Sequence, residues 1–315
     1  MSTAVSSQKK YRRGKATKQE ARAAKLFLIP AFLGLSLITY IPLASVFGIS
    51  LFSWRVPGTP SFAGFDNYRF LFRDELGFFW PAIRHTLQYA LLAVVISLIF
   101  SMCIALLLNR KLPGRAAFRT IFYMPFIIPA VATFMTFRLI YDGSGVLNSI
   151  WTALGGTRVQ FLANPSTIIP ALAMIAVWTS GNLIVIKMAG LGNVPRVYQE
   201  AAEIDGANAW YRFWHITIPC MTPIIFYNVL MSLVTNMQVF VPSLIMTQGG
   251  GSGIGVMHEQ YNLMAFILYR EGFMRGQMGR ASAISFILFV MIGVFTAILF
   301  ATSKKWLFYE GGDPK

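Results

Sequence analysis

The chain has 315 residues, of which 56% are apolar and 12% are charged. Soluble domains carry about twice that share of charged residues, so the composition argues against an aqueous globular enzyme. Lys and Arg number 27 against 12 Asp and Glu, which gives a net charge of +15. In so apolar a chain, this excess indicates the cytoplasmic side of a membrane rather than a nucleic-acid partner.

Six apolar stretches are each about as long as the ~20 residues that a helix needs to cross a bilayer. They predict an all-α polytopic membrane protein with six transmembrane helices, over about 26–53, 86–109, 118–141, 166–187, 220–247 and 281–303. Glycine sustains helices poorly, so the glycine-rich run over 249–255 ends the fifth helix and is expected to form an outer loop. The predicted organisation is a basic tail over 1–25, one membrane domain over 26–305 and a short tail over 306–315.

Basic residues are unevenly divided between alternate connections of these helices. The two termini and the connections after the second and fourth helices hold 18 of the 27 Lys and Arg residues. The positive-inside rule therefore predicts that both termini are cytoplasmic. No predicted helix carries an acidic residue near its middle, so a proton or ion is not expected to supply the energy for transport. Lys187 falls at a helix end, where a long side chain can reach the membrane interface.

Residues that carry catalytic or metal chemistry do not cluster in the sequence. The chain has no G-x-x-x-x-G-K-[ST] phosphate loop, so it is not expected to hydrolyse ATP itself. His85, His215 and His258 are scattered over both sides, and Cys103 and Cys220 are interpreted as packing residues. No enzyme site, no metal site and no directly bound cofactor are expected.

The connection over 192–219 differs from a simple linker. Asn193 as a cap, Pro195 in the first turn and Asp205-Gly206 as the stop predict a helix of about ten residues, with a second short helix after it. Pro219 then marks the return of the chain to the membrane. The first helix would carry Glu200, Ala201, Ala202 and Glu203, and the aromatic residues Trp210, Tyr211, Phe213 and Trp214 follow it. Small, acidic and aromatic residues together favour a protein interface, and an interfacial helix among lipid headgroups is the alternative.

The same connection resembles a known sequence motif. Glu200-Ala201-Ala202, then Gly206 after three residues and Ile216-Thr217-Ile218-Pro219 after nine more, match the EAA loop of bacterial ABC-importer permeases, with Ile218 where that family usually has Leu. Similarity to the maltose-like carbohydrate-uptake branch extends to Phe65-Asp66-Asn67-Tyr68, Tyr123-Met124-Pro125 and Gly279-Arg280-Ala281-Ser282-Ala283. The resemblance covers about residues 26–305.

This resemblance implies the type I ABC-importer permease (MetI-like) architecture and a subunit that takes up a sugar or oligosaccharide. In that family the EAA helix seats in a cleft of a cytoplasmic ATPase subunit, which binds the ATP and Mg. Matching positions imply coupling roles for Glu200, Ala201, Ala202, Glu203, Asp205, Gly206 and Pro219. The implied partners are two ATPase subunits, a second, non-identical permease subunit and an extracytoplasmic solute-binding protein, all at the cell membrane of a bacterium or archaeon.

Polar residues form a stripe in the fifth predicted helix. Their spacing places them on one helical face, which is expected to face protein or water rather than lipid. The candidate substrate path comprises Trp178, Asn182, Tyr227, Asn228, Ser232, Thr235, Asn236 and Phe240, whose amides and hydroxyls could bond a neutral sugar and whose aromatic rings could stack on it. Packing between helices is an equally open interpretation of the stripe.

Three other functions stay open from the sequence. The chain could serve an importer for another small solute, act as a self-contained channel or secondary carrier, or anchor other proteins at the membrane. Dependence of transport on a partner ATPase would separate an importer from a channel or carrier, and solute flux through the complex would exclude a mere anchor.

Overall fold

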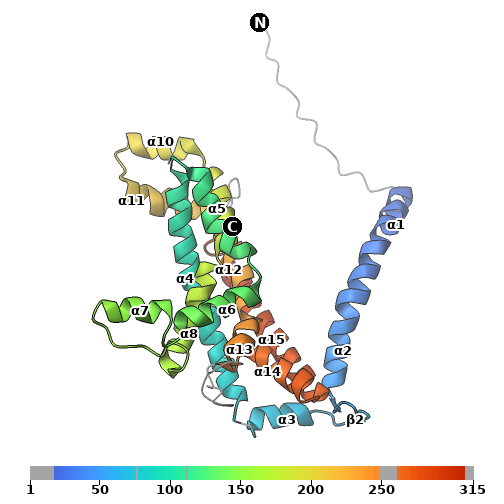
Figure 1. Cartoon of the computed structure of the whole chain (residues 1–315). Helices are drawn as coiled ribbons and strands as arrows, with labels where there is room; N and C mark the ends of the chain where they lie inside the picture. The colour runs from blue at the N-terminus through green and yellow to red at the C-terminus, as the bar shows by residue number, and fades with distance from the viewer. Residues whose placement is uncertain (1–17, 76, 111–112, 248–260, 309–315) are drawn as a thin grey trace. The chain divides into compact units, whose positions relative to one another are not determined.

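The computed structural model describes residues 18–75, 77–110, 113–247 and 261–308 (Figure 1). The chain separates into two compact units, Met1–Gly48 and Ile49–Lys315. The first predicted transmembrane helix thus falls almost entirely in a unit of its own, and the other predicted helices lie in the second unit.

Unit 1 is one long helix in its described part. It consists of α1 (Lys18–Leu35), the π-helical turn η1 (Ser36–Tyr40) and most of α2 (Ile41–Ser50). Apolar side chains such as Leu26, Phe27 and Ile38 are exposed all around it. A helix cannot cover its own apolar surface, and apolar side chains around its whole circumference are typical of a helix that crosses a membrane.

Unit 2 begins with a small hairpin and a short helix. The strands β1 (Phe52–Ser53) and β2 (Ser61–Phe62) pair antiparallel, with Phe52 opposite Phe62, and α3 (Asp66–Arg73) follows. The Asn67 side chain donates to the carbonyl oxygens of Ser50 (2.8 Å) and Phe52 (2.9 Å). Gly279 lies so close to the Phe52 carbonyl that a Cβ atom would collide with it, so only glycine fits there.

The central element of unit 2 is α4 (Phe79–Asn109) (Figure 1). It packs against α8 (Pro165–Trp178), α9 (Gly181–Gly192) and α12 (Ile218–Met237). It begins at Phe79, before the predicted start at 86, and the Asp74 carboxylate accepts a hydrogen bond from the Phe79 backbone N–H (2.8 Å). The predicted start lies after Arg84 because the prediction used only the uncharged stretch. The helix itself continues beyond the hydrocarbon of the membrane and includes Arg84. Its buried face is rich in small residues, which allow close packing of helices: Ala82, Ala90, Ala93, Ser97, Ser101 and Ala105.

Two of the predicted transmembrane helices are bent pairs. The axes of α5 (Arg115–Ile127) and of the helical stretch Ala130–Ala153, which begins with α6 (Ala130–Tyr141), meet at a bend of 97°. Those of α8 (Pro165–Trp178) and α9 (Gly181–Gly192) meet at 51°. Pro129, which has no N–H to donate, lies at the first bend. The described residues hold four helices that are long and apolar enough to span a membrane, or up to six spans when each bent pair counts as one, which agrees with the six that the sequence predicted.

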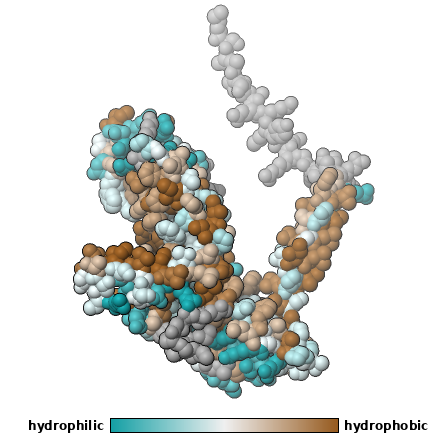
Figure 2. All heavy atoms as spheres, in the orientation of Figure 1, coloured by the Kyte–Doolittle hydropathy of each residue, from teal (hydrophilic) through white to brown (hydrophobic). Residues whose placement is uncertain are grey.

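A short amphipathic helix, α7 (Val146–Ala153), follows α6. Its apolar side chains Val146, Ile150 and Trp151 are exposed together with Leu154 after its end. In Figure 2 the arm that carries α7 has an apolar edge opposite a hydrophilic edge. This division is typical of a helix that lies in the plane of a membrane interface.

The remaining elements complete the bundle. A hairpin of α10 (Arg196–Ile204), α11 (Ala209–Arg212) and the π-helical turn η2 (Phe213–Thr217) leads into α12 (Ile218–Met237). The chain continues through α13 (Val241–Thr247), α14 (Met264–Tyr269), the π-helical turn η4 (Arg270–Met274) and α15 (Met278–Ser303). The apolar contacts between α4 and α12 form two clusters, one around Met221 and one around Met237.

Lys187 does not reach out to an interface as the sequence suggested. It is 1% exposed, and its Nζ atom donates to the Leu98 carbonyl oxygen of α4 (2.8 Å) and to the Ser101 hydroxyl. Among the described residues, no carboxylate forms an ion pair with it. The side chain turns inward because the small residues of α4 leave room for it and offer oxygen atoms to its ammonium group.

Candidate functional site

The connection between α9 and α12 folds as a helical hairpin. The α10 helix ends at Ile204, and Gly206 has a left-handed backbone with φ of 81°. The N–H groups of Gly206 and Ala207 donate to the carbonyl oxygens of Glu203 (3.1 Å) and Ala202 (2.8 Å). These bonds satisfy carbonyls that the helix end would otherwise leave free. Asp205-Gly206 therefore stops the helix, as the sequence predicted.

The start of α10 differs from the prediction. Pro195, not Asn193, is its N-terminal cap residue, and Asn193 instead caps the preceding helix α9 with its backbone N–H on the Gly190 carbonyl (3.0 Å). Proline suits this position because it has no N–H that would need a partner. The cap that the sequence analysis missed is Asn208, whose side chain accepts from the Tyr211 N–H at the start of α11 (2.8 Å).

Polar contacts hold α10 against the second arm of the hairpin. The Arg212 guanidinium donates to the Glu203 carboxylate (2.8 Å), and the Gln199 side chain donates to the Thr217 hydroxyl (3.1 Å). Pro219 lies one residue inside α12, and the helical path is continuous from α11 through η2 into α12. Pro219 has no backbone N–H, so it cannot donate a hydrogen bond to the preceding helical turn. The π-helical turn η2 lies at this place in the chain. The arm formed by α11 and η2 thus continues directly into a membrane helix, and α10 is bonded to that arm.

The two faces of α10 differ in chemistry. Its inner face borders a cavity of about 350 Å³ with Ala202 and Asp205 on one side and Pro219 on the other. Its outer face has the i, i+3, i+7 spacing and consists of Val197, Glu200 and Ile204, and Ala201 lies at the edge of this face, where it also lines the cavity. The side chains of Val197 and Ile204 are 70% and 87% exposed. Val197 and Ile204 were missed in the sequence, although their spacing relative to Glu200 and Ala201 was the signal that could have found them.

Residues of the candidate substrate path in α12 have unequal environments. Asn228 is fully buried and neither polar atom of its amide has a hydrogen-bond partner among the described residues. Ser232 is also buried and its carbonyl oxygen accepts from the half-buried Asn236 side chain (2.8 Å), whereas Thr235 is exposed. In this conformation the structure brings Asn228 and Ser232 into the packed interior and leaves Thr235 at the surface.

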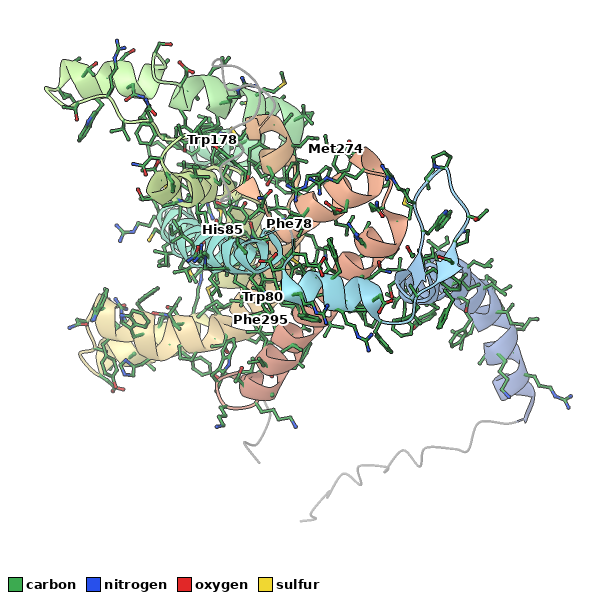
Figure 3. The ribbon with its side chains drawn as sticks, turned by 90° about the horizontal axis from the view of Figure 1, so that it is seen from below. Phe78, Trp80, His85, Trp178, Met274 and Phe295 are labelled. Carbon is green, nitrogen blue, oxygen red and sulfur yellow. The ribbon has the colours of Figure 1, made fainter. Side chains whose placement is uncertain are left out.

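The aromatic candidates lie apart from one another. Trp178, which is labelled in Figure 3, is exposed at the end of α8, and its ring contacts Phe137 of α6. Asn182 is half-buried in α9, and Tyr227 is exposed on α12. Phe240 lines a separate cavity of about 610 Å³ and contacts the ring of Tyr269. Neither Trp178 nor Asn228 lines that cavity.

A buried ion cluster that the sequence analysis did not identify lies at η4. Glu271 is fully buried, and its carboxylate accepts from Arg275 (2.6 Å) and lies 3.8 Å from the Arg270 guanidinium. Arg270 also donates to the Asn262 side chain (3.1 Å) and lies over the ring of Phe78. Burial, together with the neighbouring charge of Arg275, lowers the pKa of Arg270, and Glu271 opposes that shift. The cluster fixes the connection between α14 and α15.

A multi-pass helical membrane protein with a protruding helical hairpin is the class that this fold and site define. A family model described as "Binding-protein-dependent transport system inner membrane component" matches residues 95–305. This match spans more than half of the chain and includes the hairpin, so the chain belongs to that family of ABC-transporter permeases.

Individual relatives support the same assignment. The "Probable ABC transporter permease protein YesP" of Bacillus subtilis (strain 168) is 33% identical, over 96% of this chain and 97% of the relative. The trehalose/maltose transport system permease protein MalF of Thermococcus litoralis is 30% identical, over 89% of this chain and 93% of the relative. A chain in the crystal structure of a bacterial ABC transporter involved in the import of the acidic polysaccharide alginate shares the fold, with a TM-score of 0.76 at 23% identity over 91% of this chain and 96% of that chain.

Proposed function

We propose that this chain is the membrane-spanning subunit of an ATP-driven importer for a sugar or oligosaccharide. The observation that carries the proposal is the outer face of α10, where Val197 and Ile204 remain exposed beside Glu200 and Ala201. Exposed apolar side chains on a rigidly held helix are typical of a protein-binding surface, because burial against a partner stabilises the complex.

The occupant of this face is a cytoplasmic ATPase subunit. Two such subunits bind and hydrolyse ATP with Mg, and this chain is not an enzyme. The hairpin follows directly into α12, so movement of α10 transmits force to the membrane helices. The hairpin and both termini lie on the cytoplasmic side, a topology that the uneven division of Lys and Arg supports.

A second permease subunit and an extracytoplasmic solute-binding protein complete the transporter. Unit 1 is a lone helix with exposed apolar side chains, and a second permease would cover part of such a surface. The family description names binding-protein-dependent transport, which supports the presence of the binding protein.

The substrate class follows from the relatives and from the chemistry of α12. Relatives that each match most of this chain serve trehalose and maltose or arabinooligosaccharides, as their names state. Uncharged amide and hydroxyl groups such as those of Asn228, Ser232 and Asn236 suit a neutral polyhydroxyl solute. The Asn228 amide has no hydrogen-bond partner among the residues that the structure describes, and a rearrangement during transport would allow it to bond the solute.

The coupling role is tested by Glu200→Lys, which reverses the charge at the centre of the outer face of α10. We expect that the variant either recovers less ATPase subunit in a pulldown or hydrolyses ATP without uptake. Glu75→Lys is the matched control, because Glu75 is also exposed but lies in the loop after α3, far along the chain from the hairpin. Normal assembly and normal uptake in Glu200→Lys would contradict the proposal and favour a self-contained channel or carrier.

The substrate role is tested by a double variant, Asn228→Leu with Asn236→Leu. We expect uptake to fall while ATPase recovery stays at the level of the unmodified chain. The sugar is identified by a binding screen of the cognate solute-binding protein. Normal uptake by the double variant would exclude these two residues from the path.

A further inference from the structure

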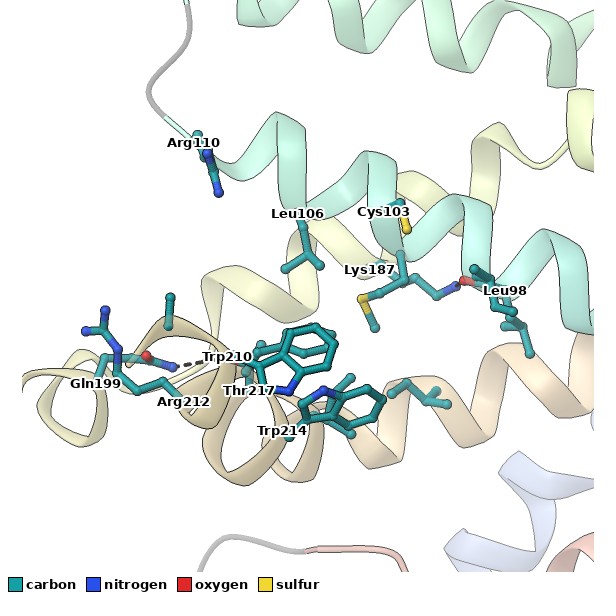
Figure 4. Close-up of a pocket in the computed structure, with 16 residues that line it drawn as sticks. Leu98, Cys103, Leu106, Arg110, Lys187, Gln199, Trp210, Arg212, Trp214 and Thr217 are labelled. Atoms are coloured by element: carbon teal, nitrogen blue, oxygen red, sulfur yellow. Dashed lines mark hydrogen bonds between the residues drawn. The ribbon is translucent and has the colours of Figure 1, made fainter. Parts of the chain in front are cut away.

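A deep groove lies between α4 and the second arm of the hairpin. Its cavity volume is about 890 Å³, and it is lined by α4, α11, η2 and α12. In Figure 4 Leu106 of α4 faces the indole rings of Trp210 and Trp214 across the groove. Ile99, Trp210 and Trp214 are exposed, so the groove is open along one side. Its walls are apolar over most of its length.

The length of the groove matches one leaflet of a bilayer. It extends along α4 from Leu98 to Arg110, which corresponds to about 18 Å at the rise of an α-helix. The hydrocarbon core of a membrane is about 30 Å thick, so each leaflet contributes about 15 Å. An acyl chain that enters at one end of the groove can therefore remain in it down to the middle of the membrane.

Both ends of the groove carry cationic side chains, but these differ in burial and in their hydrogen-bond partners. At the inner end, the ammonium group of Lys187 is bonded to the Leu98 carbonyl oxygen and the Ser101 hydroxyl. At the other end, Figure 4 shows Arg110 and Arg212 on opposite walls. Arg110 is exposed and its guanidinium forms no ion pair with any described residue, and Arg212 bonds Glu203 through one nitrogen atom. The groove thus has an apolar shaft and a cationic mouth.

We propose that this groove binds one anionic phospholipid of the cytoplasmic leaflet. Its phosphate pairs with Arg110 and Arg212, and an acyl chain lies along Ile99, Met102 and Leu106 of α4. The assignment of the leaflet rests on the proposed function, which places the hairpin on the cytoplasmic side. Basic pockets between membrane helices on that side are suited to anionic headgroups.

The chemistry of the groove favours lipid over the other occupants that its position allows. A sugar would leave hydroxyl groups without partners against the apolar walls, which is costly. A transmembrane helix of a second permease would cover the walls but would bring no anion to Arg110. Because α11 and η2 form one wall and also carry α10, the bound lipid holds the hairpin at a fixed depth relative to the membrane.

The test measures lipid retained by the purified transporter complex. The complex is reconstituted in nanodiscs with equal amounts of phosphatidylglycerol and phosphatidylcholine, and retained lipid is identified by native mass spectrometry after release. The unmodified chain should retain phosphatidylglycerol in preference to phosphatidylcholine. Arg110→Gln should weaken that retention about fivefold, the loss expected for one arginine near an anionic surface. Arg119→Gln is the matched control, because Arg119 is exposed on α5 and does not line the groove.

A second pair of variants tests the apolar shaft without changing charge. Leu106→Trp should fill the groove and abolish specific retention, whereas Leu107→Trp should not, because Leu107 is exposed on the neighbouring face of α4 and does not line the groove. Equal retention of both lipids, or retention unchanged by Arg110→Gln and Leu106→Trp, would overturn the inference. Loss of a second permease from the Leu106→Trp complex, with lipid retained, would show instead that a protein helix occupies the groove.

The lipid measurement and the uptake assay can fail separately. Absence of sugar uptake would remove the proposed function and leave selective lipid retention intact. Unselective retention with normal sugar uptake would remove the lipid site and leave the proposed function intact.

Discussion

The α10 helix and the contact between α4 and α9 arrange their side chains in opposite ways. On α10, which lies outside the membrane-spanning segments, apolar Val197 and Ile204 are exposed. Between α4 and α9, inside them, Lys187 is buried and bonded to α4. The exposed apolar face indicates a partner that is absent from the isolated chain, whereas the buried cation is already satisfied by its neighbours. Exposed apolar side chains therefore indicate a binding surface on α10, whereas the buried charged side chain of Lys187 contributes to helix packing between α4 and α9.

A double-mutant cycle on Lys187 and Ser101 tests the packing half of this comparison and has the largest expected effect. Ser101→Ala removes an oxygen that accepts from the Lys187 ammonium, and a hydrogen bond to a charged group contributes about 2 kcal/mol. Ser101→Ala should therefore lower the free energy of unfolding in detergent by about 2 kcal/mol. The same substitution in the Lys187→Met background should cost much less.

The cycle isolates this pair because Met fills nearly the same volume as Lys without a charge. The coupling between the two substitutions is the measured quantity. A cost for Ser101→Ala that is equal in both backgrounds would show that the hydroxyl does not stabilise the ammonium group, and the buried cation would then need another explanation.

Ile204→Ser tests the binding half. Burial of an exposed apolar side chain at an interface contributes more than about 1 kcal/mol at a central position. We expect the affinity for the ATPase subunit to fall about tenfold, equivalent to ~1.4 kcal/mol. The free energy of unfolding of the permease should change by less than about 0.5 kcal/mol, because Ile204 is exposed in the isolated chain.

Leu154→Ser is the matched control for Ile204→Ser. Leu154 is also an exposed apolar residue, but it follows α7 rather than lying in the hairpin. It should leave the affinity for the ATPase unchanged. If Ile204→Ser binds the ATPase as tightly as the unmodified chain, the outer face of α10 is not the docking surface.

The sequence predicted those features that depend on neighbours in the chain. The helix over α10 and its stop at Gly206 follow from local preferences, and the six apolar stretches follow from composition. The inward turn of Lys187 was not predictable, because it requires Leu98 and Ser101 of another helix. The burial of Asn228 likewise depends on the packing of α12 against its neighbours, whereas spacing alone gives only the face of the helix on which it lies.

Gly206→Ala tests whether the geometry of the hairpin, and not only its surface, is required. The left-handed backbone at Gly206 costs an L-residue roughly 1–2 kcal/mol. No atom lies within 4 Å of the position of an added Cβ atom, so the cost comes from the backbone alone. We expect α10 to fray at its end, measured as faster amide exchange at Ala207, and ATPase recovery to decline moderately. Gly192→Ala at the end of α9 has open space and no left-handed backbone, so it should have neither effect.

Glu203→Gln should have the smallest effect on the free energy of unfolding, because the hairpin is exposed to water and the α4–α9 contact is not. The Glu203 side chain is 68% exposed, so water screens its ion pair with Arg212, and such pairs contribute no more than about 1 kcal/mol. Glutamine keeps an oxygen that can accept from Arg212 at the same position. The free energy of unfolding should therefore change within that limit, and the change should shrink further at high salt, where surface charges are screened. A loss of 2 kcal/mol or more, on the order of a buried charged bond, would mean that a partner or the membrane shields this pair, and that the hairpin is as enclosed as the contact that holds Lys187.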